Sequence, residues 1–140
     1  MGLTVISEHF SIKFGYIALA LFGQQRRKSA MEQLNIDKVK EFATQKRIRK
    51  KLLGSDKIVA EMVCYEPGQA TPEHVHPKQD EIFYVVEGTG AMIVNGEEIP
   101  LKPTSLILVK AREKHGVRTL PDSRLVLMFI KAPGSTKTAA

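Results

Sequence analysis

Two histidines one residue apart, His74 and His76, are the residues whose types and spacing most directly suggest chemistry. In a β-strand, residues i and i+2 point to the same face, so these two imidazoles can approach one point in space. Glu81 follows at the start of an apolar segment, where an ionised carboxylate is costly unless a cation or hydrogen bonds compensate it. A third histidine, His115, begins a later apolar segment. Together these four side chains predict a metal site.

The predicted ligand set contains three imidazoles and one carboxylate. Such a borderline-soft set suits one divalent transition metal per chain and does not suit calcium or magnesium. Iron, manganese, nickel, cobalt, copper and zinc all remain open, because the order of affinities and cellular availability can disagree. A single histidine is more often a surface or core residue, but the shared face of His74 and His76 and the nearby Glu81 favour the metal site.

Short strands separated by turns make up the part of the sequence that must position these side chains. We expect one short helix over residues 37–44 and strands over 47–53, 57–65, 73–76, 81–87, 91–94, 97–101, 106–109, 115–120 and 124–130. Asn95-Gly96 is the strongest hairpin signal, because a type I′ turn needs positive φ at both central residues. Many short strands with almost no helix predict an all-β sandwich or barrel.

The length of 140 residues indicates one folded domain. We expect an N-terminal extension over residues 1–34, a β-barrel domain over 35–132 and a flexible tail over 133–140. The single cysteine, Cys64, permits no intramolecular disulfide, so a cytoplasmic location is expected.

The first thirty residues have two possible interpretations. The apolar stretch 14–23 is too short for a membrane span, which needs about 20 residues, and Lys13 interrupts a signal-peptide pattern. Met31 follows a basic run and could be the physiological start. Alternatively, the segment adds a strand or helix that packs on the domain or on a second subunit.

The net charge of +6 comes from one segment. Residues 26–51 contain ten lysines or arginines and three acidic residues, while the remainder of the chain is close to neutral. A basic segment without interleaved aromatic residues or a nucleic-acid motif is usually a solvated face. We therefore expect neither a nucleic-acid nor a membrane partner.

Gly68, His74, His76, Glu81 and Gly88 reproduce the spacing G-x5-H-x-H-x4-E-x6-G. This pattern resembles the first conserved motif of the cupin superfamily, and the resemblance covers about residues 46–130. It implies a double-stranded β-helix, or jelly-roll barrel, of the small single-domain cupin type. It also implies that these two histidines and Glu81 bind a metal together with a histidine of the second motif, at position 115.

The second motif departs from the cupin pattern. Thr104, Lys110 and Arg112 stand where the family usually has Gly, Pro and Gly. A residue with a side chain at such a glycine position either strains the turn or changes it. Lys110 and Arg112 are candidates for attracting an anionic substrate. The simpler interpretation, which we favour, is a solvated turn in which Glu113 balances the basic residues.

The expected pocket and partners follow from strand parity. Phe83 and Val85 share the parity of Glu81, and Val117 shares that of His115, so these side chains should face the barrel interior. Residues 125–130 are apolar on both faces, so the outer face needs cover from a second copy or from the N-terminal segment. Small cupins are commonly dimers, so the resemblance implies a homodimer.

Two classes of function remain. The first is a small metal-dependent enzyme that acts on a small, possibly anionic, organic molecule, with dioxygenation, decarboxylation or isomerisation among the reactions that the resemblance implies. The second is a non-catalytic module that binds or senses a small molecule or a metal. No general base outside the ligand set stands out in the sequence.

Overall fold

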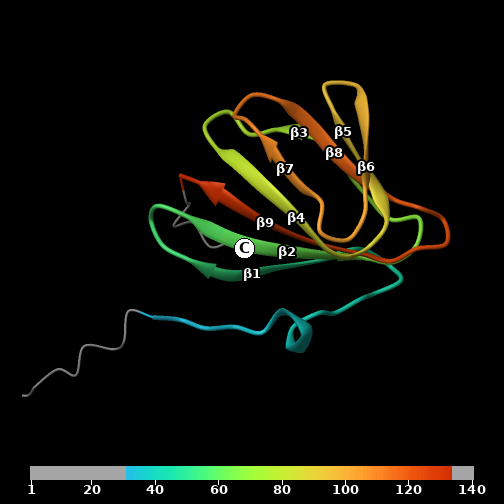
Figure 1. Cartoon of the computed structure of the whole chain (residues 1–140), viewed down its shortest axis with the longest axis horizontal. Helices are drawn as coiled ribbons and strands as arrows, with labels where there is room; N and C mark the ends of the chain where they lie inside the picture. The colour runs from blue at the N-terminus through green and yellow to red at the C-terminus, as the bar shows by residue number, and fades with distance from the viewer. Residues whose placement is uncertain (1–30, 134–140) are drawn as a thin grey trace, which may run out of the picture. The chain divides into compact units, whose positions relative to one another are not determined.

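The chain folds into two antiparallel β-sheets that face each other, as Figure 1 shows for the computed structural model. The structure describes residues 31–133, so the expectations for residues 1–30 and for the tail beyond residue 133 lie outside the described residues. The described strands are β1 (Ile48–Gly54), β2 (Val59–Tyr65), β3 (Ala70–Val75), β4 (Asp80–Gly88), β5 (Gly90–Val94), β6 (Glu97–Leu101), β7 (Leu106–Val109), β8 (Lys114–Thr119) and β9 (Leu125–Ala132).

The strand order gives the sheets a jelly-roll arrangement. One sheet has the order β1-β2-β9-β4-β7, and the other has the order β3-β8-β5-β6. The chain crosses from one sheet to the other at every connection between consecutive strands except β1–β2 and β5–β6. The all-β barrel expected from the sequence is therefore confirmed, and the crossing between β3 and β4 brings the predicted metal ligands to the space between the sheets.

The main core lies between the two sheets. Alternate residues of β2, β4 and β9 point inward, as period-two strands require. Phe83 and Phe129 stack there with ring centroids 5.3 Å apart. The buried core residues are Val63, Tyr65, Phe83, Val85, Met92, Leu101, Val109, Val117, Leu125, Leu127 and Phe129. Phe83 and Phe129 of this core also form one wall of the candidate site.

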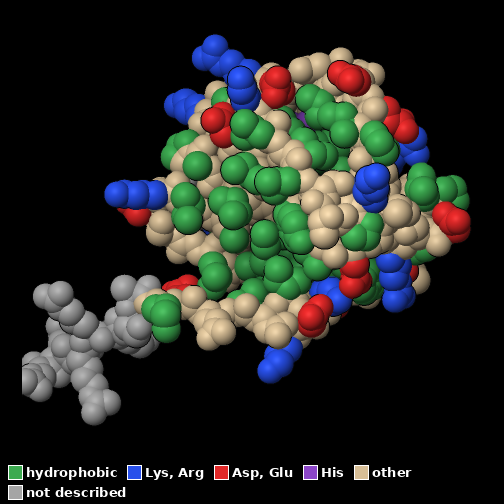
Figure 2. Space-filling model, viewed as in Figure 1, with side chains coloured by type: hydrophobic (Ala, Val, Ile, Leu, Met, Phe, Trp, Pro, Cys, Tyr) green, Lys and Arg blue, Asp and Glu red, His purple; other side chains and the backbone are tan. Residues whose placement is uncertain are grey.

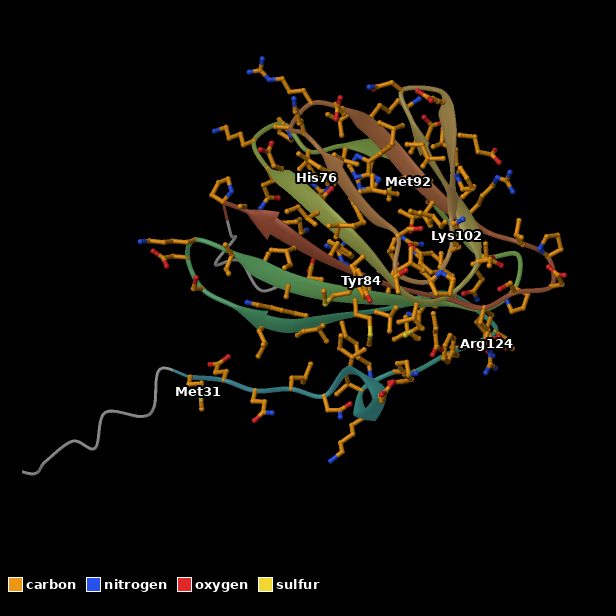
Figure 3. All side chains as sticks on the ribbon, in the orientation of Figure 1. Met31, His76, Tyr84, Met92, Lys102 and Arg124 are labelled. Atoms are coloured by element: carbon orange, nitrogen blue, oxygen red, sulfur yellow. The ribbon has the colours of Figure 1, made fainter. Side chains whose placement is uncertain are left out.

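A second, smaller cluster covers part of the outer face of the five-stranded sheet. Met62, Cys64 and Val126 are buried there under side chains that include Ile36 and Phe42, in the segment before β1. The guanidinium of Arg124 lies 4.5 Å from the Phe42 ring centroid, and Figure 3 shows Arg124 beside this segment. The segment before β1 thus supplies part of the cover that the doubly apolar strand β9 needs.

The helix expected over residues 37–44 is wrong. The segment forms only one 3-10 turn, η1 (Ile36–Lys38), and the side chain of Asn35 accepts a hydrogen bond from the backbone N–H of Asp37. A helix this short is marginal by itself. The segment instead follows the sheet in an irregular path that lets Val39 and Phe42 both pack on it.

The hairpin expected at Asn95-Gly96 is confirmed. The two residues join β5 to β6 and have φ angles of 50° and 86°. No helix among residues 31–133 has the length and apolar character to span a bilayer.

An apolar part of the same outer face remains exposed in the described chain. The side chains of Ile82, Leu106, Leu108 and Ile130 form it, and we call these four residues the β7 face. Leu106 is 69% exposed and Leu108 is 55% exposed. Ile82 pairs with Leu108 on one side and with Ile130 on the other, so the face is continuous across β7, β4 and β9. Figure 2 shows hydrophobic side chains gathered over these strands.

Candidate metal centre

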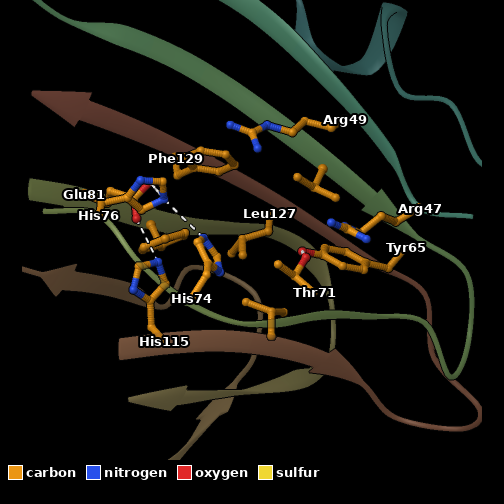
Figure 4. A pocket seen from close by; sticks show the side chains of 13 residues that line it. Arg47, Arg49, Tyr65, Thr71, His74, His76, Glu81, His115, Leu127 and Phe129 are labelled. Atoms are coloured by element: carbon orange, nitrogen blue, oxygen red, sulfur yellow. Dashed lines mark hydrogen bonds and ion pairs between the residues drawn. The ribbon is translucent and has the colours of Figure 1, made fainter. Parts of the chain in front are cut away.

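The candidate site lies between the two sheets, because its residues come from both. His74 on β3 lies directly opposite His115 on β8 in the four-stranded sheet. Glu81 reaches the same place from β4 of the five-stranded sheet, and His76 follows directly after the end of β3. Figure 4 shows the four side chains gathered at one end of a pocket. The structure thus brings together all four side chains that the sequence singled out.

A close approach between β3 and β8 sets the position of His74. The pairing of these strands is irregular between Thr71 and His74. At Gly116, beside His115, an added Cβ would lie 2.9 Å from the backbone N of Glu73 and 2.9 Å from the backbone O of Thr71. Only glycine fits this contact without a backbone shift.

The three imidazoles form a tight group. Their candidate ligand nitrogens all lie within 4.8 Å of one another. Nε2 of His76 lies 3.1 Å from Nε2 of His74 and 3.5 Å from Oε1 of Glu81. A group with these distances could hold a metal ion.

Backbone carbonyls determine which ring nitrogen is free in two of the histidines. Nδ1 of His74 lies 2.9 Å from the carbonyl of Pro72, and Nδ1 of His115 lies 3.0 Å from the carbonyl of Glu113. A carbonyl oxygen only accepts, so each Nδ1 carries the proton and each neutral ring presents an Nε2 lone pair toward the group. This second hydrogen bond is the one that orients metal-binding histidines in proteins.

The donor set itself supports a cation at this position. Oε2 of Glu81 and Nε2 of His115 are 2.8 Å apart, and both atoms are buried with no other hydrogen-bond partner among the described residues. A neutral His115 would direct its Nε2 lone pair toward an anionic carboxylate at that distance. A cation bound by both atoms removes this repulsion and satisfies both groups. The residues present therefore fit a divalent transition metal.

The pKa values of two histidines move in opposite directions. Burial lowers the pKa of His76 below its ordinary value, and the nearby Glu81 carboxylate offsets this only in part. Burial also disfavours the charged form of His115, but the carboxylate of Glu81 and the carbonyl of Glu113 outweigh burial and raise the pKa of His115. The Glu81 carboxylate thus attracts positive charge most strongly at His115.

A small pocket opens beside the histidines. Its lining consists of Arg47, Arg49, Val63, Tyr65, Thr71, His74, His76, Glu81, Phe83, His115, Val117, Leu127 and Phe129. The pocket is small, with room for a few water molecules.

The substrate-pocket candidates differ in where they lie. Phe83 and Val117 line the pocket, as strand parity predicts. Val85 faces inward but is buried in the core, away from the lining. Lys110 and Arg112 are exposed and do not line the pocket.

The altered second motif keeps the backbone conformation that glycine normally adopts. Thr104 and Arg112 have φ angles of 70° and 73°, so the turns are strained rather than changed. The backbone N–H of Arg112 donates to the carbonyl of His76 at 2.8 Å, and the N–H of Ala111 donates to Asp80 Oδ1 at 2.8 Å. The backbone at Arg112 thus ties the turn before His115 to the segment that carries His76.

Sequence reasoning missed the charged residues on the side of the pocket opposite the histidines. Arg47 and Arg49 line it, and Glu61 joins Arg49 to the buried Lys131. The two arginines belong to the basic segment, but their spacing puts both on one face of an expected strand. That spacing was the feature of the sequence from which a pair of pocket arginines could have been predicted.

Comparisons with known proteins agree with this architecture. The structure resembles the crystal structure of TT1209 from Thermus thermophilus with a TM-score of 0.70 and 28% identity, over 74% of this chain and 98% of that one. The tetracenomycin polyketide synthase protein TcmJ of Streptomyces glaucescens is 35% identical over 67 residues, which are 48% of this chain and 45% of that protein. The L-ectoine synthase of Aliivibrio fischeri (strain MJ11) is 31% identical over 72 residues, which are 50% of this chain and 56% of that protein. This chain spans about half the length of the curated relatives it matches.

The family model described as "Cupin domain" matches residues 61–131, which contain all four residues of the candidate site. This match covers half of the chain. The jelly-roll arrangement and the clustered histidines agree with it. The chain belongs to the cupin family.

Proposed function

We propose that this chain is a metal-dependent enzyme that acts on a small, anionic organic molecule, in a reaction of the dioxygenase, decarboxylase or isomerase type. His74, His76, Glu81 and His115 would hold one divalent transition metal. The observation that carries the proposal is the pair of buried atoms, Glu81 Oε2 and His115 Nε2, that face each other at 2.8 Å and have no other hydrogen-bond partner among the described residues.

Each residue of the site has a part in this proposal. The Pro72 and Glu113 carbonyls hold the rings of His74 and His115 with Nε2 directed inward. The carboxylate of Glu81 balances part of the cation's charge. A bound divalent transition metal would supply Lewis acidity toward a substrate oxygen. Phe83 and Phe129 form an apolar wall that keeps the site poor in water and strengthens its electrostatic interactions.

The names of the relatives support an enzyme but not one reaction. They include L-ectoine synthase and polyketide synthase proteins, and also an oxalate-binding protein of Thermotoga maritima that is 25% identical over 64 residues. Fold and family membership do not transfer a substrate. The proposal therefore names a reaction class and leaves the particular substrate open.

One observation favours binding without turnover as a second candidate function. Outside the four proposed ligands, the polar residues that line the pocket are Arg47, Arg49, Tyr65 and Thr71. None of these is a carboxylate or an imidazole, and burial raises the pKa of Tyr65 further above its ordinary value. A reaction that needs a general base would have to obtain it from the substrate or from a ligand.

The two functions differ in the chemistry that the loaded site must show. We would load the purified chain with cobalt(II), record its visible absorption, and titrate azide, with the His76→Ala variant as the control. An enzyme with open ligand positions should give a saturable spectral change that the variant lacks. Turnover would then be sought with small carboxylates and the physiological metal. If azide does not change the spectrum of the cobalt-loaded chain, the result would contradict the proposed enzyme function and favour binding without turnover.

A further inference from the structure

Strand β1 and the residue before it bring two arginines to the pocket from the side opposite the histidines. Arg47 and Arg49 are two residues apart, so both point toward the barrel interior. Figure 4 shows Arg47 near Tyr65 and Arg49 near Phe129, with the histidine group at the other end of the pocket. Both arginines also line an outer hollow together with Lys46 and Ile48. They therefore stand between the inner pocket and solvent.

Arg49 already has a partner within the protein. Its Nη2 lies 2.6 Å from Oε2 of Glu61, and the same oxygen accepts Nζ of Lys131 at 2.9 Å. The Glu61 and Lys131 side chains are 11% and 8% exposed. The Arg49 side chain is 48% exposed, so it joins this buried pair from the surface, and two cations share one carboxylate.

Arg47 differs from Arg49, because the described residues give its side chain no ion pair or hydrogen bond. Its guanidinium therefore keeps its donors available. On this side the pocket is lined by two cations, Arg47 and Arg49, and by no acidic residue among those described, although Glu61 pairs with Arg49. The remaining acid, Glu81, faces the histidines. This excess of positive charge favours an anion at the pocket.

We infer that Arg47 is the anchor for the carboxylate group of the substrate, with Arg49 held beside it by Glu61. The planar guanidinium fork binds a carboxylate through two parallel hydrogen bonds. The hydroxyls of Tyr65 and Thr71, 2.7 Å apart and both in the lining, provide neutral polar contacts next to it. The small pocket favours a compact carboxylate over a bulkier anion. The inference rests on the proposed function and deepens it by naming the substrate class.

The anchor also gives the substrate a direction. A carboxylate at Arg47 places the rest of a short molecule between the apolar side chains Leu127 and Phe129, and its far end toward the histidine group. Arg47 would thus set which end of the substrate reaches the reacting atoms. The exposed Lys110 and Arg112 are not needed for this.

The test uses the full chain loaded with zinc, propionate as the anionic probe and propionamide as its neutral counterpart. Binding is followed through the backbone amide signals of Tyr65 and Thr71 in 1H–15N spectra. The variants are Arg47→Gln, which removes the charge, Arg47→Lys, which keeps the charge without the fork, and Lys46→Gln as the control. Lys46 carries the same charge on the adjacent residue, but it lines only the outer hollow.

We expect Arg47→Gln to weaken propionate binding by about tenfold, which is the loss of a bidentate charged contact, and Arg47→Lys to fall in between. Lys46→Gln should leave the affinity within about twofold of the original chain, as expected for a screened surface charge. Propionamide should bind at least about tenfold more weakly than propionate.

Three results would overturn the anchor: no propionate binding by the original chain, equal affinity in Arg47→Gln, or an equal loss in Lys46→Gln. Zinc stoichiometry, measured on the same samples, separates this outcome from failure of the proposed function. If zinc does not bind but propionate binding still depends on Arg47, the metal site fails and the anchor stands. If zinc binds at one per chain and propionate binding does not depend on Arg47, the anchor fails and the metal site stands.

Discussion

Oε2 of Glu81 and Nε2 of His115 lie 2.8 Å apart, and both atoms are buried with no other hydrogen-bond partner among the described residues. The two residues come from different sheets, so their meeting depends on the complete jelly roll rather than on a local motif. Buried polar atoms in folded proteins are nearly always satisfied. A cation held by both residues would satisfy both atoms.

Glu61 should control how the chain responds to acid. Burial alone would raise its pKa, but hydrogen bonds from Arg49 and Lys131 outweigh burial and lower the pKa below the ordinary value of 4.5. A lowered pKa means that the carboxylate stabilises the fold above that ordinary value, and that this stability is lost as pH falls through the lower folded value. Glu61→Gln should cost about 2 to 3 kcal/mol near neutral pH, because it leaves Lys131 buried without its charged partner.

Urea unfolding of both chains across the acidic range checks this expectation. The difference in the free energy of unfolding between the original chain and Glu61→Gln should shrink as the pH falls below 4.5. Glu98→Gln, which alters an exposed ion pair with Arg118, is the control and should change stability little. A difference that stays constant with pH would show that Glu61 does not act through its charge.

Gly116 should be essential to the position of His74. An added Cβ would meet the backbone of Glu73 and Thr71 at 2.9 Å, so Gly116→Ala must push β3 away from β8. We expect a loss of stability of about 1 to 3 kcal/mol, as for other overpacked sites. Metal affinity should fall by about tenfold or more, as when supporting residues of a metal site are altered.

Gly54→Ala provides the matched control, because its added Cβ would come no closer than 3.2 Å to a neighbour and it lies on the edge strand β1. Thermal unfolding and metal titration of the two variants make the comparison. Equal metal affinity in Gly116→Ala and in the original chain would refute the role assigned to this close approach.

Arg112 should act through its backbone and not through its charge. Its φ of 73° destabilises the folded state by about 1 to 2 kcal/mol for a residue with a side chain. Glycine removes this strain, but it also raises the conformational entropy of the unfolded chain, so only part of the free energy is recovered. Arg112→Gly should therefore raise the free energy of unfolding by about 0.5 to 1 kcal/mol, with metal affinity unchanged. Arg112→Ala, which keeps the strain, should give no such gain. A loss of stability in Arg112→Gly would indicate that the exposed guanidinium matters.

We propose that a second copy of the chain covers the β7 face. This face is apolar and continuous over three strands, while the segment before β1 covers the neighbouring part of the same sheet. Leu108→Lys, near its centre, should convert a dimer into a monomer in light scattering at micromolar concentration. Leu120→Lys changes an exposed leucine outside the face and should leave the dimer intact. A monomeric original chain would exclude the proposal.

The four clustered side chains could be predicted because their signal is local. The His74 and His76 spacing, the acidic Glu81 at a strand start and the cupin pattern are all visible along one stretch of sequence. The group of Arg49, Glu61 and Lys131 could not be found in this way, because it depends on the non-local pairing of β1, β2 and β9.

The segment before β1 shows a different limit of prediction from the sequence. Its spacing of Val39 and Phe42 suits a helix, but packing on the sheet under Arg124 determines its path. Tertiary contacts override a weak local preference in a segment this short. The charge of Arg112 is likewise visible in the sequence, whereas its backbone bond to the His76 carbonyl is not.

The most direct test of the central claim is the metal content per chain of tag-free protein, measured by inductively coupled plasma mass spectrometry beside Glu81→Gln and His76→Ala. Glu97→Gln, at the exposed start of β6, is the matched control. We predict close to one divalent transition metal in the original chain and in the control, and its loss from both site variants. Metal below about a tenth of an equivalent after reconstitution, or content that the two site variants leave unchanged, would contradict the metal site.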